Sequence, residues 1–519
     1  MSPKTNFLFI MVDQCRADWL GCAGHPVVKT PNIDALAARG TRFENFFAAS
    51  PVCMPNRASF MTGRYPDTHG LRHNGLPLSS RASTFVEVLA AGGYQTASIG
   101  KSHLQPFTDT PPKFPRPVTG PIAEAWKEDS ADYTLEQPEH YQSGESFDFP
   151  TPYYGFGHVD MVTGHGDRAG GHYAQWFRAT HPDWRRLTDP ASQLPHDYTC
   201  PQAYRTPIPE DSYPTAYIRD RAIEHLARHA GDEAPLFTFV SFPDPHHPFN
   251  PPGRYWDMYD PDDFDLPLPY AAHRNPPPPL QALRRDFDAG KPAAAPTSGT
   301  MVSDRQAREA MALTAGMISM IDDAVGALVQ TLRDTGQLDN TVIVFNADHG
   351  DYLGDYNILL KGPWSAESIT RVPMIWCDPA HPGGNTSAAL GSTVDLSATI
   401  LARAGLRGYN GMQGINLLPC LDGETRLRDR LLVEYNGALP QMGFDGPSRV
   451  RSLITHDWYL TLYGGADWGE LYDRHATPLQ GNNLWDDPAH AATRAAMTQD
   501  LALLMIEQMD RSPLSKRLA

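Results

Sequence analysis

The chain has 519 residues, of which 41% are hydrophobic and 20% charged, a composition typical of a water-soluble globular protein. Its formal charge of −17 argues against a general nucleic-acid binder, because no broad positive field would attract a polyanion, although a pocket of opposite sign could still bind a small anion. The apolar run near the N-terminus is short and no stretch of about 18 apolar residues follows, so we expect neither a signal peptide nor a membrane span.

Apolar runs of strand length alternate with helical patterns along most of the chain. Residues 5–12 form a continuous apolar run of the kind found in a parallel strand buried on both faces. The other predicted elements, in order, are helix 31–40, helix 83–92, strand 94–100, helix 216–230, strand 236–242, helix 305–335 and strand 341–347. This alternation predicts an α/β fold with a large, mostly parallel sheet sandwiched by helices.

Two stretches interrupt the alternation, and the C-terminal part has a different pattern. Residues 105–215 and 243–300 are rich in proline and aromatic residues, and we interpret them as long insertions over the sheet that could form the walls of a site. After about residue 420, short strand patterns precede a helix at 488–510. We therefore predict a larger domain over 1–420 and a smaller α+β domain, built on a short antiparallel sheet, over 421–519.

Polar side chains follow two of the predicted strands. Asp13 and Gln14 come after strand 5–12, and Asp348 and His349 come after strand 341–347. Ligand sites of parallel sheets lie beyond the carboxyl ends of the strands, and carboxylate, amide and imidazole groups suit a divalent cation. Taken alone, Asp13 could equally well cap a helix, and His349 could be a structural histidine. Both pairs together, with the segment described next, favour a metal site.

Residues 53–64 read C-M-P-N-R-A-S-F-M-T-G-R, and Cys53 is the unusual residue in this segment. It could be a small buried hydrophobe, or a thiolate whose pKa is lowered by Arg57 and Arg64. The six cysteines are scattered without a CxxC pair, which disfavours a disulfide framework or a zinc knuckle and favours reduced thiols in the cytoplasm.

A third interpretation of this segment comes from a family resemblance. The segment resembles the C-x-P-x-R signature of the type I sulfatases, formylglycine-dependent enzymes of the alkaline phosphatase superfamily. Asn56 and Phe60 depart from the commonest residues of that signature. The resemblance implies that a formylglycine-generating enzyme oxidises Cys53 to Cα-formylglycine, an aldehyde. The matching positions are Cys53, Pro55, Arg57, Thr62, Gly63 and Arg64.

The resemblance extends over most of the chain. Residues 100–104 resemble the family's Lys-x-His element, residues 243–249 its P-H-x-P segment, and residues 469–484 its C-terminal stretch. Family spacing selects His246 over His247. The Asp-Gln and Asp-His pairs resemble the branch of choline sulfatase and phosphonate monoester hydrolase more than the animal arylsulfatases.

The resemblance also implies a role for each matching residue. One divalent cation, Ca²⁺ with Mn²⁺ and Mg²⁺ as alternatives, would bind residue 53 and the two strand-end pairs. The hydrated aldehyde would attack the sulfur of a sulfate ester, and Arg57 would stabilise this hydrate. Two lysines would bind the non-reacting oxygens, while one histidine serves as base and another as donor to the leaving oxygen. The implied metal ligands are Asp13, Gln14, Cys53, Asp348 and His349, and the residue that would stabilise the hydrate is Arg57. The two lysines are Lys101 and Lys361, the base is His103 and the donor to the leaving oxygen is His246.

Three alternatives remain open at this stage. The nearest is a phosphonate monoester or phosphodiester hydrolase on the same fold, which the Lys-x-His element disfavours because we expect that branch to lack it. The second is an unmodified, non-catalytic homologue that binds anions. The third is a metal-independent cysteine hydrolase that uses Cys53 with His103 or His246. The alcohol half of the substrate and the oligomeric state, a homo-oligomer included, are not determined.

Overall fold

The computed structural model describes residues 5–112, 120–122, 124–127, 129–291, 299–476 and 479–517. Its main sheet has eight strands in the order β10-β2-β9-β7-β1-β5-β3-β4, and only β9 runs antiparallel to its neighbours. This arrangement confirms the predicted, mostly parallel sheet. The strands are β1 (Asn6–Val12), β2 (Thr41–Phe47), β3 (Gln95–Gly100), β4 (His158–Met161), β5 (Leu236–Phe242), β7 (Thr341–Ala347), β9 (Met374–Cys377) and β10 (Asn385–Ser392).

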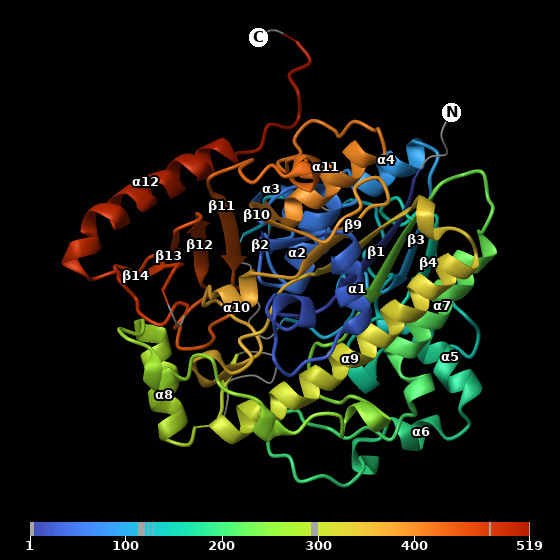
Figure 1. Ribbon diagram of the computed structural model, residues 1–519, viewed down its shortest axis with the longest axis horizontal. Helices are drawn as coiled ribbons and strands as arrows, with labels where there is room; N and C mark the ends of the chain where they lie inside the picture. Colours follow the sequence, from blue (N-terminus) through green and yellow to red (C-terminus); the bar gives the residue numbers. More distant parts are fainter. Residues whose placement is uncertain are drawn as a thin grey trace.

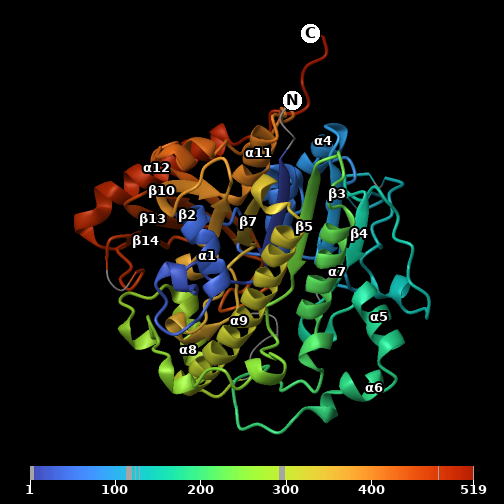
Figure 2. The same ribbon diagram turned by 45° about the vertical axis from the view of Figure 1, so that its right-hand side comes forward.

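Helices cover both faces of the main sheet (Figure 1). On one face α7 contacts α9 and α9 contacts α1; on the other α11 contacts α2 and α4 (Figure 2). The helices, shorter ones included, are α1 (Pro31–Arg39), α2 (Cys53–Thr62), α3 (Pro66–His69), α4 (Phe85–Ala91), α5 (His172–Thr180), α6 (Trp184–Leu187), α7 (Pro214–Arg228), α8 (Pro278–Asp288), α9 (Asp304–Asp334), α10 (Glu367–Thr370) and α11 (Thr393–Arg403).

The central strands and the long helix α9 lie in the core of the protein because their residues are mostly apolar. All seven residues of β5 and of β7 are buried, as expected for strands covered on both faces. Among the described residues, α9 alone is long and apolar enough to cross a membrane, yet 78% of its apolar window is buried inside the protein. It is therefore a core helix of this fold.

The register of the strands brings their carboxyl ends to one level. Val12 of β1 lies opposite Phe242 of β5 and Ala347 of β7, and Gly100 of β3 lies opposite Ser241 of β5. The residues that follow β7, β1, β5 and β3 therefore meet at a single edge of the sheet. The structure shows in this way how segments more than three hundred positions apart can form one site.

The segment 105–215 does more than cover the sheet. It contributes β4, which pairs in parallel with β3, and the helices α5 and α6. The prediction of a simple covering insertion is wrong in this respect, because a strand of four residues is too short to show periodicity. Parts of both predicted insertions, 113–119, 123, 128 and 292–298, lie outside the described residues.

The C-terminal part forms the predicted antiparallel sheet, with strand order β11-β12-β13-β14 and helix α12 (Ala491–Glu507) packed against it. Leu432 and Leu453 from this sheet share an apolar cluster with Tyr65 and Val394 from the larger part. The boundary at residue 420 stays a prediction. The remaining strands are β11 (Leu431–Asn436), β12 (Arg449–Ile454), β13 (Trp458–Tyr463), β14 (Gly469–Asp473) and the short pair β6 (Thr300–Met301) and β8 (Ile358–Leu359).

The end of β3 requires glycine at position 100. Gly100 has a φ of +104°, and a Cβ there would lie 2.1 Å from the carbonyl oxygen of Ser241. We expect Gly100→Ala to lower the free energy of unfolding by roughly 3 kcal/mol, because backbone strain and overpacking add. Gly70→Ala is the matched control: its φ is +87° but no atom lies within 4 Å, so strain alone should cost about 1 kcal/mol. Equal urea midpoints for the two variants would contradict this account.

Candidate active site

The strand-end residues meet at the carboxyl edge of the main sheet. The backbone N–H of Asp348 donates to the carbonyl of Val12 at 3.1 Å, and the N–H of Asp13 donates to the carbonyl of Asp244 at 3.1 Å. The N–H of Lys101 donates to the carbonyl of Ser241 at 2.9 Å. These hydrogen bonds extend the parallel pairing by one residue beyond each strand. They hold the side chains that the sequence predicted to be functional on one backbone frame.

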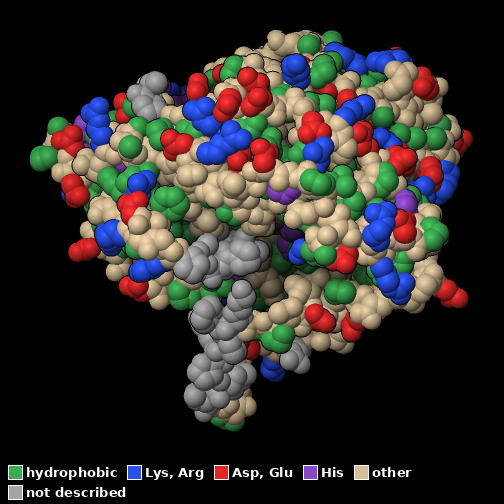
Figure 3. Space-filling model, turned by 90° about the horizontal axis from the view of Figure 1, so that it is seen from below, with side chains coloured by type: hydrophobic (Ala, Val, Ile, Leu, Met, Phe, Trp, Pro, Cys, Tyr) green, Lys and Arg blue, Asp and Glu red, His purple; other side chains and the backbone are tan. Residues whose placement is uncertain are grey.

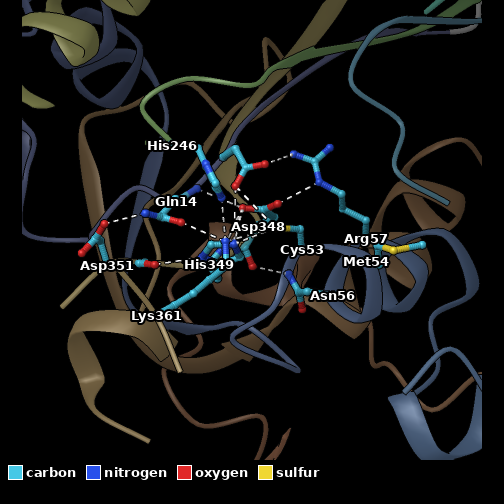
Figure 4. Close-up of polar contacts among 12 residues, drawn as sticks. Gln14, Cys53, Met54, Asn56, Arg57, His246, Asp348, His349, Asp351 and Lys361 are labelled. Atoms are coloured by element: carbon cyan, nitrogen blue, oxygen red, sulfur yellow. Dashed lines mark hydrogen bonds and ion pairs between the residues drawn. The ribbon is translucent and has the colours of Figure 1, made fainter. Parts of the chain in front are cut away.

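Cys53 begins α2 and its side chain reaches this edge. Its Sγ lies 3.2 Å from Nε2 of His349, 3.2 Å from Nζ of Lys361 and 3.8 Å from Oδ1 of Asp13 (Figure 4). The residue is almost fully buried, like the rest of α2. The predicted convergence of position 53 with two distant strand ends is therefore present in the structure.

Four of the predicted ligands form a compact donor set. The ligand atoms of Asp13, Cys53, Asp348 and His349 lie within 4.8 Å of one another, and all four residues are buried. Nδ1 of His349 lies 2.8 Å from the carbonyl oxygen of Gly350, an arrangement that places the proton on Nδ1 and leaves Nε2 free as a ligand atom. Two carboxylates and one imidazole suit a divalent cation, so these residues fit the metal that the sequence predicted.

Gln14, the fifth predicted ligand, is held at both ends of its amide. Its Oε1 accepts a hydrogen bond from Lys361 at 2.8 Å, and its Nε2 donates to Asp351 at 2.5 Å and to Nδ1 of His247 at 3.2 Å. Gln14 also has a φ of +64°, a left-handed conformation that is rare outside glycine and is found at functional sites. Asp351 was not predicted, and it acts here by orienting Gln14.

Arg57 connects four strand ends. Its Nε donates to Asp348 at 2.8 Å, and its Nη1 donates to the carbonyl of Lys101 and to the hydroxyl of Ser241, both at 2.8 Å. Its Nη2 lies 3.5 Å from Oδ2 of Asp13. The guanidinium is buried, so these contacts compensate the cost of removing its charge from water. Its predicted role toward the aldehyde hydrate stays a prediction.

The two predicted lysines both belong to this cluster but have different partners. Lys361 donates to Gln14, approaches the sulfur of Cys53 at 3.2 Å and lies 2.9 Å from Nε2 of His246. Lys101 forms an ion pair with Asp13 and is completely buried. The structure thus places two ammonium groups around position 53, as an anionic substrate requires.

The two predicted catalytic histidines differ in their surroundings. Nδ1 of His246 lies 2.6 Å from the carbonyl oxygen of His247, and its Nε2 faces Lys361. His103 lies two residues after Lys101, has a φ of +56° and packs against the tilted ring of Phe107 at 4.3 Å between ring centroids. Nδ1 of His103 is buried without a hydrogen-bond partner among the described residues. The base and donor roles of these histidines stay predictions.

His165 is a member of the cluster that the sequence analysis missed. Its Nε2 lies 2.7 Å from Nζ of Lys101 and 3.7 Å from Oδ2 of Asp13, and its ring stacks on His246. His165 lies four residues beyond the end of β4 (His158–Met161), in the sequence G-H-G-D. The rule that located Asp13 and Asp348, polar residues just after a strand, would have found it had β4 been recognised.

The charges of the cluster shift one another's pKa values. Burial opposes ionisation of Asp13, but Lys101, His246 and Arg57 together outweigh it and hold its pKa well below the usual range. Burial and Asp13 oppose ionisation of the Cys53 thiol, yet Lys361, Lys101 and His349 together lower its pKa. Burial, followed by Lys101, lowers the pKa of His165 to about 3, so this ring is neutral at neutral pH. The site as a whole favours anions.

The site opens on the side of the molecule toward which the central parallel strands point. Figure 2 shows the parallel strands of the main sheet directed downward, and Figure 3 views that lower face directly. Histidine side chains lie there at a hollow in the surface (Figure 3). His165, whose side chain is 16% exposed, is more accessible than Asp13 or Lys101, whose side chains are 0% exposed.

Comparisons with known proteins support the resemblance seen in the sequence. The profile of the family described as "Sulfatase" matches residues 5–406, and that described as "N-sulphoglucosamine sulphohydrolase, C-terminal" matches residues 359–507. The chain is 27% identical to the multifunctional alkaline phosphatase superfamily protein PehA of Trinickia caryophylli, with 98% of this chain and 96% of the relative covered.

Two further relatives represent the predicted branch. The choline-sulfatase of Rhizobium meliloti is 26% identical, with 95% of this chain and 85% of the relative covered. The crystal structure of the phosphonate monoester hydrolase of Agrobacterium radiobacter has a TM-score of 0.77 and 25% identity, with 99% of this chain and 100% of that chain covered. The predicted family and branch are confirmed by these likenesses.

Asn56, one of the two residues that depart from the commonest form of the C-x-P-x-R segment, anchors α2 to the strand ends. Its Nδ2 donates to the carbonyl of Asp348 at 2.5 Å, and its Oδ1 accepts from the N–H of Ala49 at 2.9 Å. We expect Asn56→Ala to lower the free energy of unfolding by about 3 kcal/mol, because it leaves buried backbone groups unpaired. Asn385→Ala, at an exposed position, should change it by less than about 0.5 kcal/mol. Urea denaturation measures both, and similar values would refute the anchoring role.

Proposed function

The chain belongs to the sulfatase family and is an enzyme of that family; from this premise we propose that it hydrolyses sulfate esters with a formylglycine made from Cys53. The observation that supports the proposal most strongly is the position of Cys53. Its sulfur lies within 3.2 Å of both His349 and Lys361, inside a buried cluster that also holds two carboxylates. An atom that faces the substrate from position 53 would therefore lie beside the groups that can bind a cation and beside the ammonium group of Lys361.

The proposed cation is held by Asp13, Asp348, His349 and the side chain at position 53, with Gln14 as a further oxygen ligand. The donor set is rich in oxygen, which favours Ca²⁺ over softer metals and leaves Mn²⁺ and Mg²⁺ as alternatives. When bound, such an ion neutralises negative charge and lowers the pKa of a hydroxyl group beside it. Arg57 bonds to Asp348 and approaches Asp13, and so fixes the orientation of both carboxylates.

The proposed reaction needs two hydroxyl groups at position 53, which a hydrated aldehyde supplies and a serine or cysteine does not. One oxygen attacks sulfur, the bond from sulfur to the alcohol oxygen breaks, and the alcohol leaves with a proton. A base then removes the proton of the second hydroxyl, the carbon–oxygen bond to sulfate breaks, and the aldehyde returns. We assign His103 to the base and His246 to the leaving oxygen; His246 donates there once its Nε2 carries a proton and no longer accepts from Lys361.

The lysines neutralise the charge of the ester. Lys101 and Lys361 are both buried in the cluster around position 53, where water does not weaken their attraction for an anion. Each can donate an N–H to a non-reacting sulfate oxygen as charge develops in the transition state. The alcohol half of the substrate is not part of the proposal. Its other parts are the modifying enzyme as a partner and a cytoplasmic location.

The second candidate is a phosphonate monoester hydrolase on the same fold. It is favoured by the similarity to the Agrobacterium radiobacter structure and by the Asp-Gln and Asp-His pairs of this chain, which resemble those of that branch. Lys101 and His103 argue for the sulfate ester, because they resemble the Lys-x-His element of the sulfatases. The buried ion pair of Lys101 with Asp13 supports an active-site position for the lysine of this element.

The chemical state of Cys53 is the first test. When the protein is produced together with a formylglycine-generating enzyme, the peptide that contains Cys53 should lose about 18 Da relative to the thiol, because oxygen replaces sulfur and two hydrogens. The peptide that contains Cys420 should keep the full thiol mass and serves as the control. Active protein with an unmodified Cys53, resistant to EDTA and blocked by thiol alkylation, would instead show a cysteine hydrolase.

The choice between sulfate and phosphonate is tested by comparing kcat/KM for an aryl sulfate and an aryl phosphonate monoester. We expect the sulfate to be preferred, and Lys101→Ala to lower its kcat/KM by about 10²–10³, the usual loss for one charged transition-state contact. Lys291→Ala, which removes an exposed lysine, should leave kcat/KM unchanged. A wide preference for the phosphonate would make the second candidate the correct one.

A further inference from the structure

The two active-site lysines are held in the same way. Lys361 contacts one predicted metal ligand, Gln14, and one histidine, His246. Lys101 contacts another predicted metal ligand, Asp13, and one histidine, His165. Each ammonium group therefore has two fixed partners beside position 53. His246 already has a proposed role at the leaving oxygen, whereas His165 has none.

The two histidines also contact each other. The rings of His165 and His246 stack with centroids 3.6 Å apart and planes 10° from parallel. The stack fixes the ring plane of His165. The ring of Phe107 packs edge-on against the same imidazole, with 5.8 Å between the ring centroids. The imidazole of His165 is thus confined by rings from two separate segments of the chain.

The hydrogen bond to Lys101 determines which nitrogen of His165 carries the proton. An ammonium group only donates, so Nε2 of His165 accepts at 2.7 Å and the proton of the neutral ring lies on Nδ1. Lys101 has three N–H groups, of which one points to Asp13 and one to His165. Among the described residues the third N–H has no hydrogen-bond partner, so it remains for a substrate oxygen, and its direction is set once the other two are fixed.

The loop that carries His165 is built to a defined shape. Gly164 and Gly166 flank His165 with φ values of +71° and +55°. A Cβ at Gly166 would lie 2.6 Å from Oδ1 of Asn250, so this glycine is needed for the close approach. Nδ2 of Asn250 in turn donates to Asp167 at 2.8 Å. The loop is therefore fastened to the segment that also carries His246.

We infer that His165 is a positioning residue of the sulfate site, which aims the remaining N–H of Lys101 at a non-reacting oxygen of the ester. This inference rests on the proposed function. It assigns a task to the segment 105–215, which the family resemblance leaves without one. The acceptor atom Nε2 carries the effect, while the stacked ring only holds that atom in place.

Two variants separate the acceptor from the ring. His165→Gln keeps an acceptor near the position of Nε2, and His165→Phe keeps the ring without it. With an aryl sulfate, we expect His165→Phe to lower kcat/KM by about 10², mainly through kcat, and His165→Gln to stay within about tenfold of the unaltered enzyme. Calorimetric titration with inorganic sulfate should show weaker binding to the Phe variant only. His196→Phe, in the same segment but next to Trp256, is the control with no expected change.

The outcomes divide clearly. Full activity of His165→Phe would overturn the inference, and so would equal losses in the Phe and Gln variants when both keep the thermal midpoint of the unaltered protein. A loss of sulfate binding in the Phe variant that the Gln variant restores supports it. If the unaltered enzyme hydrolyses neither aryl sulfate nor aryl phosphonate, the proposed function fails, and the sulfate titrations still decide the role of His165.

Discussion

The buried guanidinium of Arg57 is the contact on which the rest of the site depends. It bonds to groups at the ends of β7, β3 and β5 and approaches Asp13 after β1, so one side chain of α2 ties four strand ends together. Removing one partner of a buried pair of this kind typically costs about 3–5 kcal/mol, because the other charge is left uncompensated. The same contact sets the distance of α2 from the sheet, and hence of Cys53 from the two carboxylates.

The site is cationic inside an acidic protein. The chain carries a formal charge of −17, yet three cationic side chains, Arg57, Lys101 and Lys361, lie in the cluster around position 53. Burial keeps this local field from being screened by water, so it acts on an anionic ester over the short distance that matters. The net charge of the surface and the charge of the site therefore serve different purposes, solubility for one and substrate binding for the other.

The segment 105–215 supports the site in two places. Its Glu136 accepts hydrogen bonds from the backbone N–H groups of His103, Leu104 and Gln105 at 3.0, 2.9 and 3.1 Å, which stabilises the turn where His103 adopts its left-handed conformation. Its His165 approaches Lys101 from the neighbouring strand end. This segment has little internal periodicity, so its ordered conformation depends on its contacts with the residues that follow β3.

Local sequence was sufficient for the apolar strands β1, β5 and β7, for the long helix α9 and for the polar pairs that follow β1 and β7, because burial on both faces and strand ends leave a signal in consecutive residues. The identity of the Cys53 segment was also readable, since its motif is continuous in the chain. The tertiary structure alone decided that β4 joins the sheet, that Asn56 anchors α2, and that His165, Asp351 and His247 stand beside the predicted residues. These contacts are made between residues dozens to hundreds of positions apart, and their geometry depends on strand register and on the packing of α2, which no short stretch of sequence records.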